Sequence, residues 1–391
     1  MLGGSFLGLL AGVLSGYVPG LHPNTFFSEY DPGPVGRDDL LSFAVTASAI
    51  NAPVSKLESM FLGVPDDQTT TAVLVPFQRY ALAGRAEEAA RLSALGTLST
   101  ALITAPLVLA LSGVAPKVYG ALRPAVPALV LAVIGVQAVD NGLDGLVVSG
   151  ASAGVGCLAL LWGSMNVPGP IESMLTGFYA VGPGLSCALN RPEIPRQGRA
   201  RPRVSGVDLL RCGVLGTLTG VVLGLLPGLG PANVVSLLRR LGIRRADEYI
   251  MVVSGVDASD NLTSIVALYA LGNPRSGASV FLQEHLGGMT WGEALEAAGL
   301  YAATLPVGTW LLVRSSRVFG AVLTGARAQV ATVVVTLALL ALSAGRGPGA
   351  LGLCLVCSGI GIYALRRGVD PSVCSAALAV PTALRLAGVW G

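Results

Sequence analysis

The stretch Gly8-Leu-Leu-Ala-Gly12-Val-Leu-Ser-Gly16-Tyr-Val-Pro19-Gly20-Leu21-His22-Pro23-Asn24 occurs twice in this chain. Its second copy is Gly216-Thr-Leu-Thr-Gly220-Val-Val-Leu-Gly224-Leu-Leu-Pro227-Gly228-Leu229-Gly230-Pro231-Ala-Asn233. A glycine at every fourth residue leaves one helix face without side chains, so another backbone can approach it closely. Pro-Gly-Leu-x-Pro then breaks the helix, because proline has no N–H group and glycine accepts unusual dihedral angles. The sequence therefore predicts two glycine-striped helices, each ending in a break.

Composition indicates that these helices lie in a membrane. Apolar residues make up 52% of the chain and charged residues only 12%, whereas a soluble domain carries about a quarter charged residues. Several nearly uncharged runs are long enough to cross hydrocarbon as helices, namely 92–115, 124–139, 145–163, 295–313, 328–345 and 349–365. We predict an all-α, multi-pass protein of the cell membrane, with broken helices because Gly and Pro are so frequent. The net charge of +3 gives no indication of a nucleic-acid partner.

The doubled motif belongs to a longer internal repeat. Leu62-Gly63-Val64-Pro65 matches Leu271-Gly272-Asn273-Pro274, and Gly154-Val-Gly156 matches Gly359-Ile-Gly361. We predict a first transmembrane repeat over 1–190, a linker over 191–206 and a second transmembrane repeat over 207–391. The linker carries five arginines against one glutamate, so the positive-inside rule places it in the cytoplasm.

Matched loops of the two halves carry opposite charge. Residues 25–40 have four acidic residues against one arginine, whereas the matching residues 239–248 have four arginines against two acidic residues. Residues 79–91 have a net charge of +1, and the matching residues 283–293 have −2. Such sign changes are expected if the halves lie oppositely in the membrane. We predict two inverted structural repeats, in which the glycine motifs form re-entrant hairpins. In this scheme Arg314, Arg317, Arg366 and Arg367 lie on the cytoplasmic side.

Polar stretches between apolar ones are the candidate sites. Burying an unpaired ionisable residue in hydrocarbon costs roughly 2.5–3.5 kcal/mol, so these side chains are expected to face a cavity or each other. The N-termini of broken helices attract anions, and freed carbonyls with nearby side-chain oxygens suit a hard cation. The candidate substrate-binding residues are Pro19, Gly20, His22, Asn24, Asp66, Thr69, Thr70, Pro227, Gly228, Gly230, Asn233, Asn273, Arg275 and Ser276. The candidate ligands of a coupling sodium ion or proton are Asn51, Asp257, Asp260 and Asn261.

Structural roles are open alternatives for the same residues. The glycine stripes can serve helix packing alone, and the breaks can be ordinary loops. Asp66 and Asp67 can be a solvated helix N-terminus, where aspartate is favoured. Asp257 and Asp260 can belong to a structural polar network. His22, which stands where the second copy has Gly230, can handle a proton or be a hydrogen-bonded structural residue.

The doubled motif, Gly12 to Pro23 and Gly220 to Pro231, resembles the mark of the TctA family, the large membrane subunit of tripartite tricarboxylate transporters. Gly63-Val-Pro65-Asp66, the stretch from Tyr80 to Ala89 and the stretch from Ile362 to Pro371 are also similar to that family. The resemblance implies a secondary transporter of organic anions such as di- or tricarboxylates, driven by a proton or sodium gradient. It also implies an extracytoplasmic binding protein and a small membrane subunit as partners.

Two departures from the family pattern concern the substrate. His22 replaces a glycine, and Asp66 with Asp67 replaces small residues, which would repel a tricarboxylate unless Arg275 offsets one charge. The alternatives are a lipid-handling membrane protein or a non-transporting scaffold. The sequence shows no HExxH motif and no Ser/His/Asp grouping, and it has only two histidines. We therefore expect no enzyme activity and no cofactor, with the lipid bilayer and further copies of the chain as other candidate partners.

Overall fold

The structure is a computed structural model that describes residues 2–23, 26–27, 33, 35–65, 67–160, 167–190, 193–225, 229–235, 238, 240 and 242–389. Apart from one backbone bridge between Ile194 and Gly325, these residues form helices, turns and loops. A helix satisfies its own backbone hydrogen bonds, which hydrocarbon requires. Among the described residues, seven helical segments are long and apolar enough to cross a membrane: Arg37–Leu62, Ala86–Leu111, Ala115–Asp140, Gly142–Leu160, Gly206–Leu225, Ala326–Gly345 and Pro348–Arg367. The predicted all-α polytopic membrane fold is confirmed.

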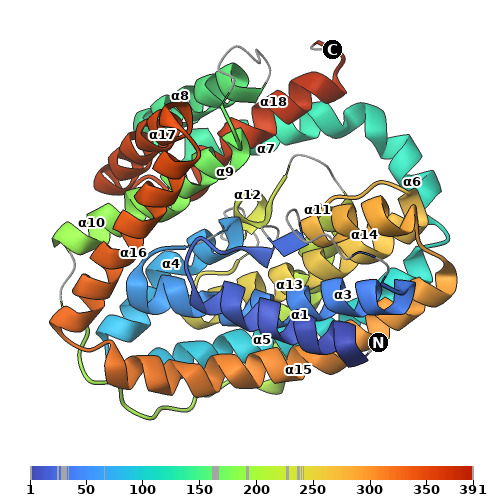
Figure 1. The fold of residues 1–391 in the computed structure, drawn as a ribbon, viewed down its shortest axis with the longest axis horizontal. Helices are drawn as coiled ribbons and strands as arrows, with labels where there is room; N and C mark the ends of the chain where they lie inside the picture. The colour runs from blue at the N-terminus through green and yellow to red at the C-terminus, as the bar shows by residue number, and fades with distance from the viewer. Residues whose placement is uncertain are drawn as a thin grey trace.

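The helices form two bundles that lie side by side (Figure 1). The first bundle contains α1 (Leu2–Tyr17), α3 (Arg37–Val54), α5 (Ala86–Leu111), α11 (Gly206–Leu225), α13 (Ala246–Leu271), α14 (Gly277–Leu286) and α15 (Trp291–Val322). The second contains α7 (Val126–Asp140), α8 (Gly142–Leu160), α9 (Pro170–Leu175), η3 (Thr176–Val181), α10 (Gly182–Asn190), α16 (Ala326–Gly345), α17 (Pro348–Arg367), η5 (Pro371–Ser375) and α18 (Ala376–Leu386). Helix α6 (Ala115–Leu122) leads from the first bundle toward α7, while α4 (Gln68–Leu82) and α12 (Pro231–Val235) lie between the bundles (Figure 1).

Both glycine stripes pack against the long helix that follows them. A Cβ atom on Gly8 of α1 would lie 2.5 Å from the carbonyl oxygen of Phe43 in α3. A Cβ atom on Gly220 of α11 would lie 2.6 Å from the Ser259 hydroxyl in α13. Real Cβ atoms do not tolerate such distances, so each stripe permits a helix contact that a larger residue would prevent. The predicted close packing is confirmed for both copies.

The two sequence halves exchange helices within the first bundle. Helix α5 of the first half packs on α13 of the second, and α15 of the second half packs on α3 of the first. Glycines again mark the contacts: a Cβ on Gly96 would lie 2.5 Å from the Cα of Met251, and one on Gly308 would lie 3.0 Å from the Ala49 carbonyl oxygen. Such reciprocal packing is what two equivalent repeats would produce. The inverted orientation and the boundaries at 190 and 207 stay predictions.

The predicted helix breaks are present. Helix α1 ends at Tyr17, three residues before the left-handed Gly20, and α12 begins at Pro231 after α11 has ended at Leu225. The π-helical turn η1 (Glu58–Leu62) ends at Gly63, and α13 ends at Gly272. These two matched glycines have φ angles of +69° and +61°, which a residue with a Cβ adopts only at a cost. The equivalent positions of the two halves therefore end their helices in the same way.

The described part of the linker, residues 193–206, is a strap that contacts both halves of the chain. The Gly198 amide donates to the Gly84 carbonyl (2.8 Å), in the turn between α4 and α5. The Gly325 amide, in the turn between α15 and α16, donates to the Ile194 carbonyl (2.8 Å). The strap thus joins a turn of each half. Arg317, near the end of α15, lies beside it. The cytoplasmic placement of both stays a prediction.

Candidate substrate and ion site

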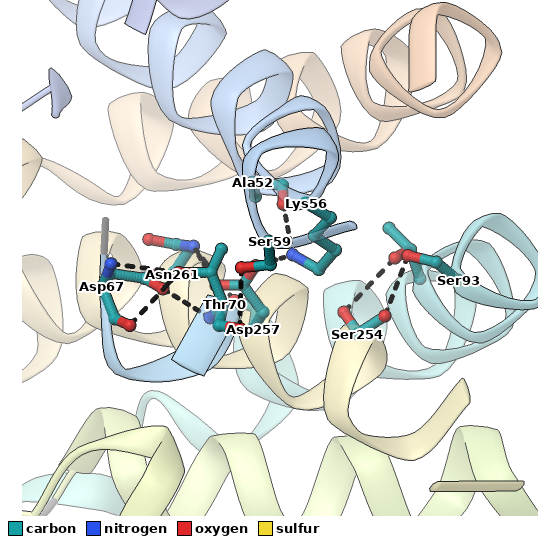
Figure 2. Close-up of polar contacts among 10 residues, drawn as sticks. Ala52, Lys56, Ser59, Asp67, Thr70, Ser93, Ser254, Asp257 and Asn261 are labelled. Atoms are coloured by element: carbon teal, nitrogen blue, oxygen red, sulfur yellow. Dashed lines mark hydrogen bonds and ion pairs between the residues drawn. The ribbon is translucent and has the colours of Figure 1, made fainter. Parts of the chain in front are cut away.

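A buried ion pair links the two halves at the centre of the first bundle. Lys56 follows α3, and its ammonium lies 2.5 Å from the carboxylate of Asp257 in α13. The side chains are 1% and 8% exposed, respectively. The ammonium also donates to the Ala52 carbonyl near the end of α3 (Figure 2). A buried charge is costly without such partners. Each of the two residues therefore offsets part of the cost of burying the charge of the other.

Further polar groups surround the Asp257 carboxylate. The side-chain amide of Asn261, one turn along α13, donates to the Asp257 carbonyl (3.0 Å) and to Oδ1 of its carboxylate (3.1 Å). The buried Thr69, at the start of α4, lies beside the same carboxylate. Figure 2 shows Lys56, Asn261 and the first turn of α4 gathered around Asp257. Two of the predicted coupling-ion ligands, Asp257 and Asn261, are therefore adjacent.

The first turn of α4 is held by a capping box. Oδ1 of Asp67 accepts hydrogen bonds from the Thr70 amide (2.6 Å) and the Thr70 hydroxyl (2.7 Å). The Ser59 hydroxyl of η1 donates to the Thr70 carbonyl (2.9 Å), which closes the hairpin across Gly63. Asp67 thus has the structural role of a helix cap. Thr70, predicted to bind substrate, is engaged in that cap.

The second Pro-Gly-Leu-x-Pro break lies against α4. A Cβ on Gly230 would lie 2.5 Å from the side-chain amide carbon of Gln68. Oδ1 of Asn233 accepts from the Gly230 amide (2.9 Å), and Gln137 of α7 donates to the Asn233 carbonyl (2.8 Å). The Asn233 amide also donates to the Ser375 hydroxyl. Asn233 therefore fixes this break to the second bundle, which is a structural role.

The first Pro-Gly-Leu-x-Pro break also lies between the bundles. Pro19 is buried, and a Cβ on Gly20 would meet the Leu339 side chain of α16. His22 is half-buried. The break therefore faces the second bundle at a helix different from those that the second break contacts.

Asn51 points away from the ion pair. It lies in α3, just over one turn before Lys56, but its amide donates to the Ser15 hydroxyl of α1 (3.0 Å). The bond is buried and ties the glycine-striped helix to α3. This contact is the kind that a structural polar network makes.

The break at Pro274, between α13 and α14, places the cation of Arg275 near an acidic residue. Arg275 precedes α14 and interacts electrostatically with Asp260 of α13. Its Nη1 is buried and has no hydrogen-bond partner in the described part of the chain. Ser276 caps α14 through its hydroxyl, which accepts from the Ser279 amide (3.3 Å). Asn273 is exposed.

The structure thus gathers some of the predicted site residues and separates others. Asp257, Asp260, Asn261, Thr69 and Arg275 lie along or beside one stretch of α13. Asn51, Asn233 and the first break lie elsewhere. Four candidates fall outside the described residues: Asn24, Asp66, Pro227 and Gly228.

Sequence reasoning did not assign a role to Lys56. The feature of the sequence that pointed to it is its position inside the apolar span Arg37–Leu62. A charge there is energetically costly and needs a partner. The partner could not be named because it lies in the other half of the chain.

A family described as the tripartite tricarboxylate transporter TctA family matches residues 2–374. A similar protein, the uncharacterized protein MJ1079 of Methanocaldococcus jannaschii, is 26% identical over 284 residues, which are 71% of this chain and 71% of that protein. No solved structure matches this chain.

Proposed function

Since this chain belongs to the tripartite tricarboxylate transporter TctA family, we propose that it carries an organic anion, such as a di- or tricarboxylate, by secondary active transport. The chain is a membrane component of a transport system by family membership. The anion, the driving ion and the partners are our proposal. As in a tripartite system, the partners are an extracytoplasmic binding protein and a small membrane subunit.

The observation that supports anion binding is a buried N–H group on the Arg275 guanidinium, which lacks a protein acceptor among the described residues. A carboxylate can accept two parallel hydrogen bonds from one guanidinium. The N-terminus of α14 begins two residues later, and its dipole also favours a negative charge. A substrate carboxylate at Arg275 would receive both interactions, with the hydroxyl of Ser276 and the amide of Asn273 nearby in sequence.

The Lys56–Asp257 pair supports the proposed coupling to an ion. In this structure the Asp257 carboxylate is already paired with the Lys56 ammonium. A sodium ion or proton that binds Asp257 would have to displace that ammonium, with Asn261 offering an amide oxygen to the ion. Asp260 lies one turn along the same helix and interacts electrostatically with Arg275. Helix α13 therefore connects the proposed cation site to the proposed anion site.

Movement between the two bundles would complete the cycle. Gly20 of the first break lies against Leu339 of the second bundle, and Asn233, which follows the second break, is hydrogen-bonded to Gln137 and Ser375 of that bundle. Secondary transporters place their sites at broken helices between moving substructures. We propose that the bundles shift against one another and open the α13 site to one side of the membrane at a time.

Replacing Arg275 by glutamine tests this proposal. We expect gradient-driven uptake of radiolabelled citrate or succinate by the reconstituted protein with its partner subunits. Arg275→Gln should weaken the apparent affinity for the anion by roughly thirtyfold or more, because truncating a buried charge partner costs about 2–5 kcal/mol. Arg275→Lys should recover only part of it, since lysine cannot form the paired hydrogen bonds.

The exposed Arg123 provides the matched control. Arg123→Gln removes one positive charge outside the site and should leave the apparent affinity unchanged. Uptake by Arg275→Gln at wild-type affinity would rule out Arg275 as the anion ligand. Absence of accumulation of every di- and tricarboxylate tested, under both proton and sodium gradients, would overturn the proposed function.

A further inference from the structure

A cavity of about 710 Å³ lies under the linker, away from the α13 site. Its walls are the linker, the start of α5, the end of α15 and the start of α16. Four arginines line it, Arg196, Arg199, Arg317 and Arg327, against the single acid Glu87. We propose that this cavity is a second binding site, and that its ligand is the phosphate-bearing headgroup of an anionic phospholipid.

Arg317 is positioned to bind such a group. Its Nη2 donates to the Glu87 carboxylate (2.8 Å), and the same carboxylate accepts from Arg91 (2.7 Å). Glu87 is therefore shared between two arginines and neutralises only part of their charge. The Nε of Arg317 is buried and has no acceptor among the residues that the structure describes. A phosphate oxygen would provide the missing acceptor through a charge-assisted hydrogen bond.

The linker arginines are held over the cavity by backbone contacts. Gly198, between Arg196 and Arg199, donates to the Gly84 carbonyl (2.8 Å). The Gln197 side chain donates to the Ala81 carbonyl (2.9 Å) and accepts from the Ala86 amide (2.9 Å). The guanidinium groups thus start from a fixed backbone, which lowers the entropy cost of binding.

The surroundings favour a lipid over a soluble phosphate compound. Exposed valines follow the cavity arginines on both helices: Val318 and Val322 on α15, and Val330 and Val334 on α16. In a membrane, such side chains face acyl chains, so a headgroup in the cavity could keep its tails along these helices. The positive-inside rule places this side in the cytoplasmic leaflet, whose anionic lipids attract basic clusters.

Lipid titration of the purified protein tests the site directly. The full chain in zwitterionic phosphatidylcholine nanodiscs is titrated with phosphatidylglycerol, and bound lipid is counted by native mass spectrometry. We expect saturable binding that glycerol 3-phosphate at the same concentration does not reproduce. Arg199→Gln and Arg327→Gln should each weaken binding about fivefold, as the loss of one arginine near an anionic surface predicts. Neither residue has a role in the α13 site, so transport is not the readout.

Arg366→Gln is the control, because it removes an exposed arginine that does not line the cavity. It should leave phosphatidylglycerol binding unchanged. Equal weakening by Arg366→Gln would show a diffuse surface attraction and overturn the site. Unchanged binding by the Arg199→Gln, Arg327→Gln double variant would also overturn it. Binding of glycerol 3-phosphate as tight as that of the lipid would keep the phosphate chemistry but reject the lipid as the ligand.

Discussion

Lys56→Met is expected to abolish ion-coupled uptake and to lower the free energy of unfolding by about 3–5 kcal/mol, the usual cost of removing one partner of a buried ion pair. The variant leaves the Asp257 carboxylate, 8% exposed, without its ammonium. The remaining amide of Asn261 donates to it at 3.1 Å but carries no charge. Denaturant unfolding in detergent measures the loss of stability, and proteoliposome uptake measures the loss of transport. The chain's other lysine, the exposed Lys117, is the control, and Lys117→Met should change neither.

The double variant Lys56→Met, Asp257→Asn separates stability from coupling. It removes both charges, so it leaves no uncompensated buried charge, which is the main cost in the single variant. We expect most of the lost unfolding free energy to return, whereas ion-dependent uptake stays absent. If the double variant takes up substrate with the wild-type dependence on the ion gradient, the pair is a structural link between α3 and α13, and the coupling proposal is wrong.

The membrane fold could be predicted from the sequence because its signals are local. Long uncharged runs indicate membrane-spanning helices. A glycine at every fourth residue indicates a close helix contact but does not identify the partner helix. Proline and glycine likewise locate the breaks at Gly20, Gly63 and Gly272, where the backbone is left-handed. Each of these properties depends on neighbours within a few residues. A single sequence is therefore enough to predict these properties.

The site was only partly predictable, because its decisive contacts join distant parts of the chain. Lys56 and Asp257 are 201 residues apart, and nothing near either residue identifies the other. Polar residue types also serve caps and sites alike. Thr70 in a capping box and Asn233 across two bundles have the same side chains as true ligands would have. Only the packing of the two halves distinguishes these roles.

The close packing of α5 on α13 predicts a large loss of stability when a side chain is added at Gly96. Gly96 of α5 has no side chain, and a Cβ there would lie 2.5 Å from the Cα of Met251, with the Met251 carbonyl oxygen closer still. These are backbone atoms, so no rotamer change can relieve the overlap, and the two helices would have to separate. We expect Gly96→Ala to lower the free energy of unfolding by about 3 kcal/mol, at the upper end of overpacking costs.

Gly299 of α15 offers the matched substitution, because it too lies within a long helix but has open space where its Cβ would be. Gly299→Ala should raise stability by up to about 1 kcal/mol, since alanine loses less backbone entropy in a helix. Because α13 carries Asp257 and Asp260, Gly96→Ala should also weaken uptake, by moving both carboxylates relative to Lys56 and Arg275. Equal unfolding free energies for the two variants would mean that α5 and α13 are not in backbone contact. In that case the exchange of helices between the halves would lose its main support, and the position of Asp257 would need another explanation.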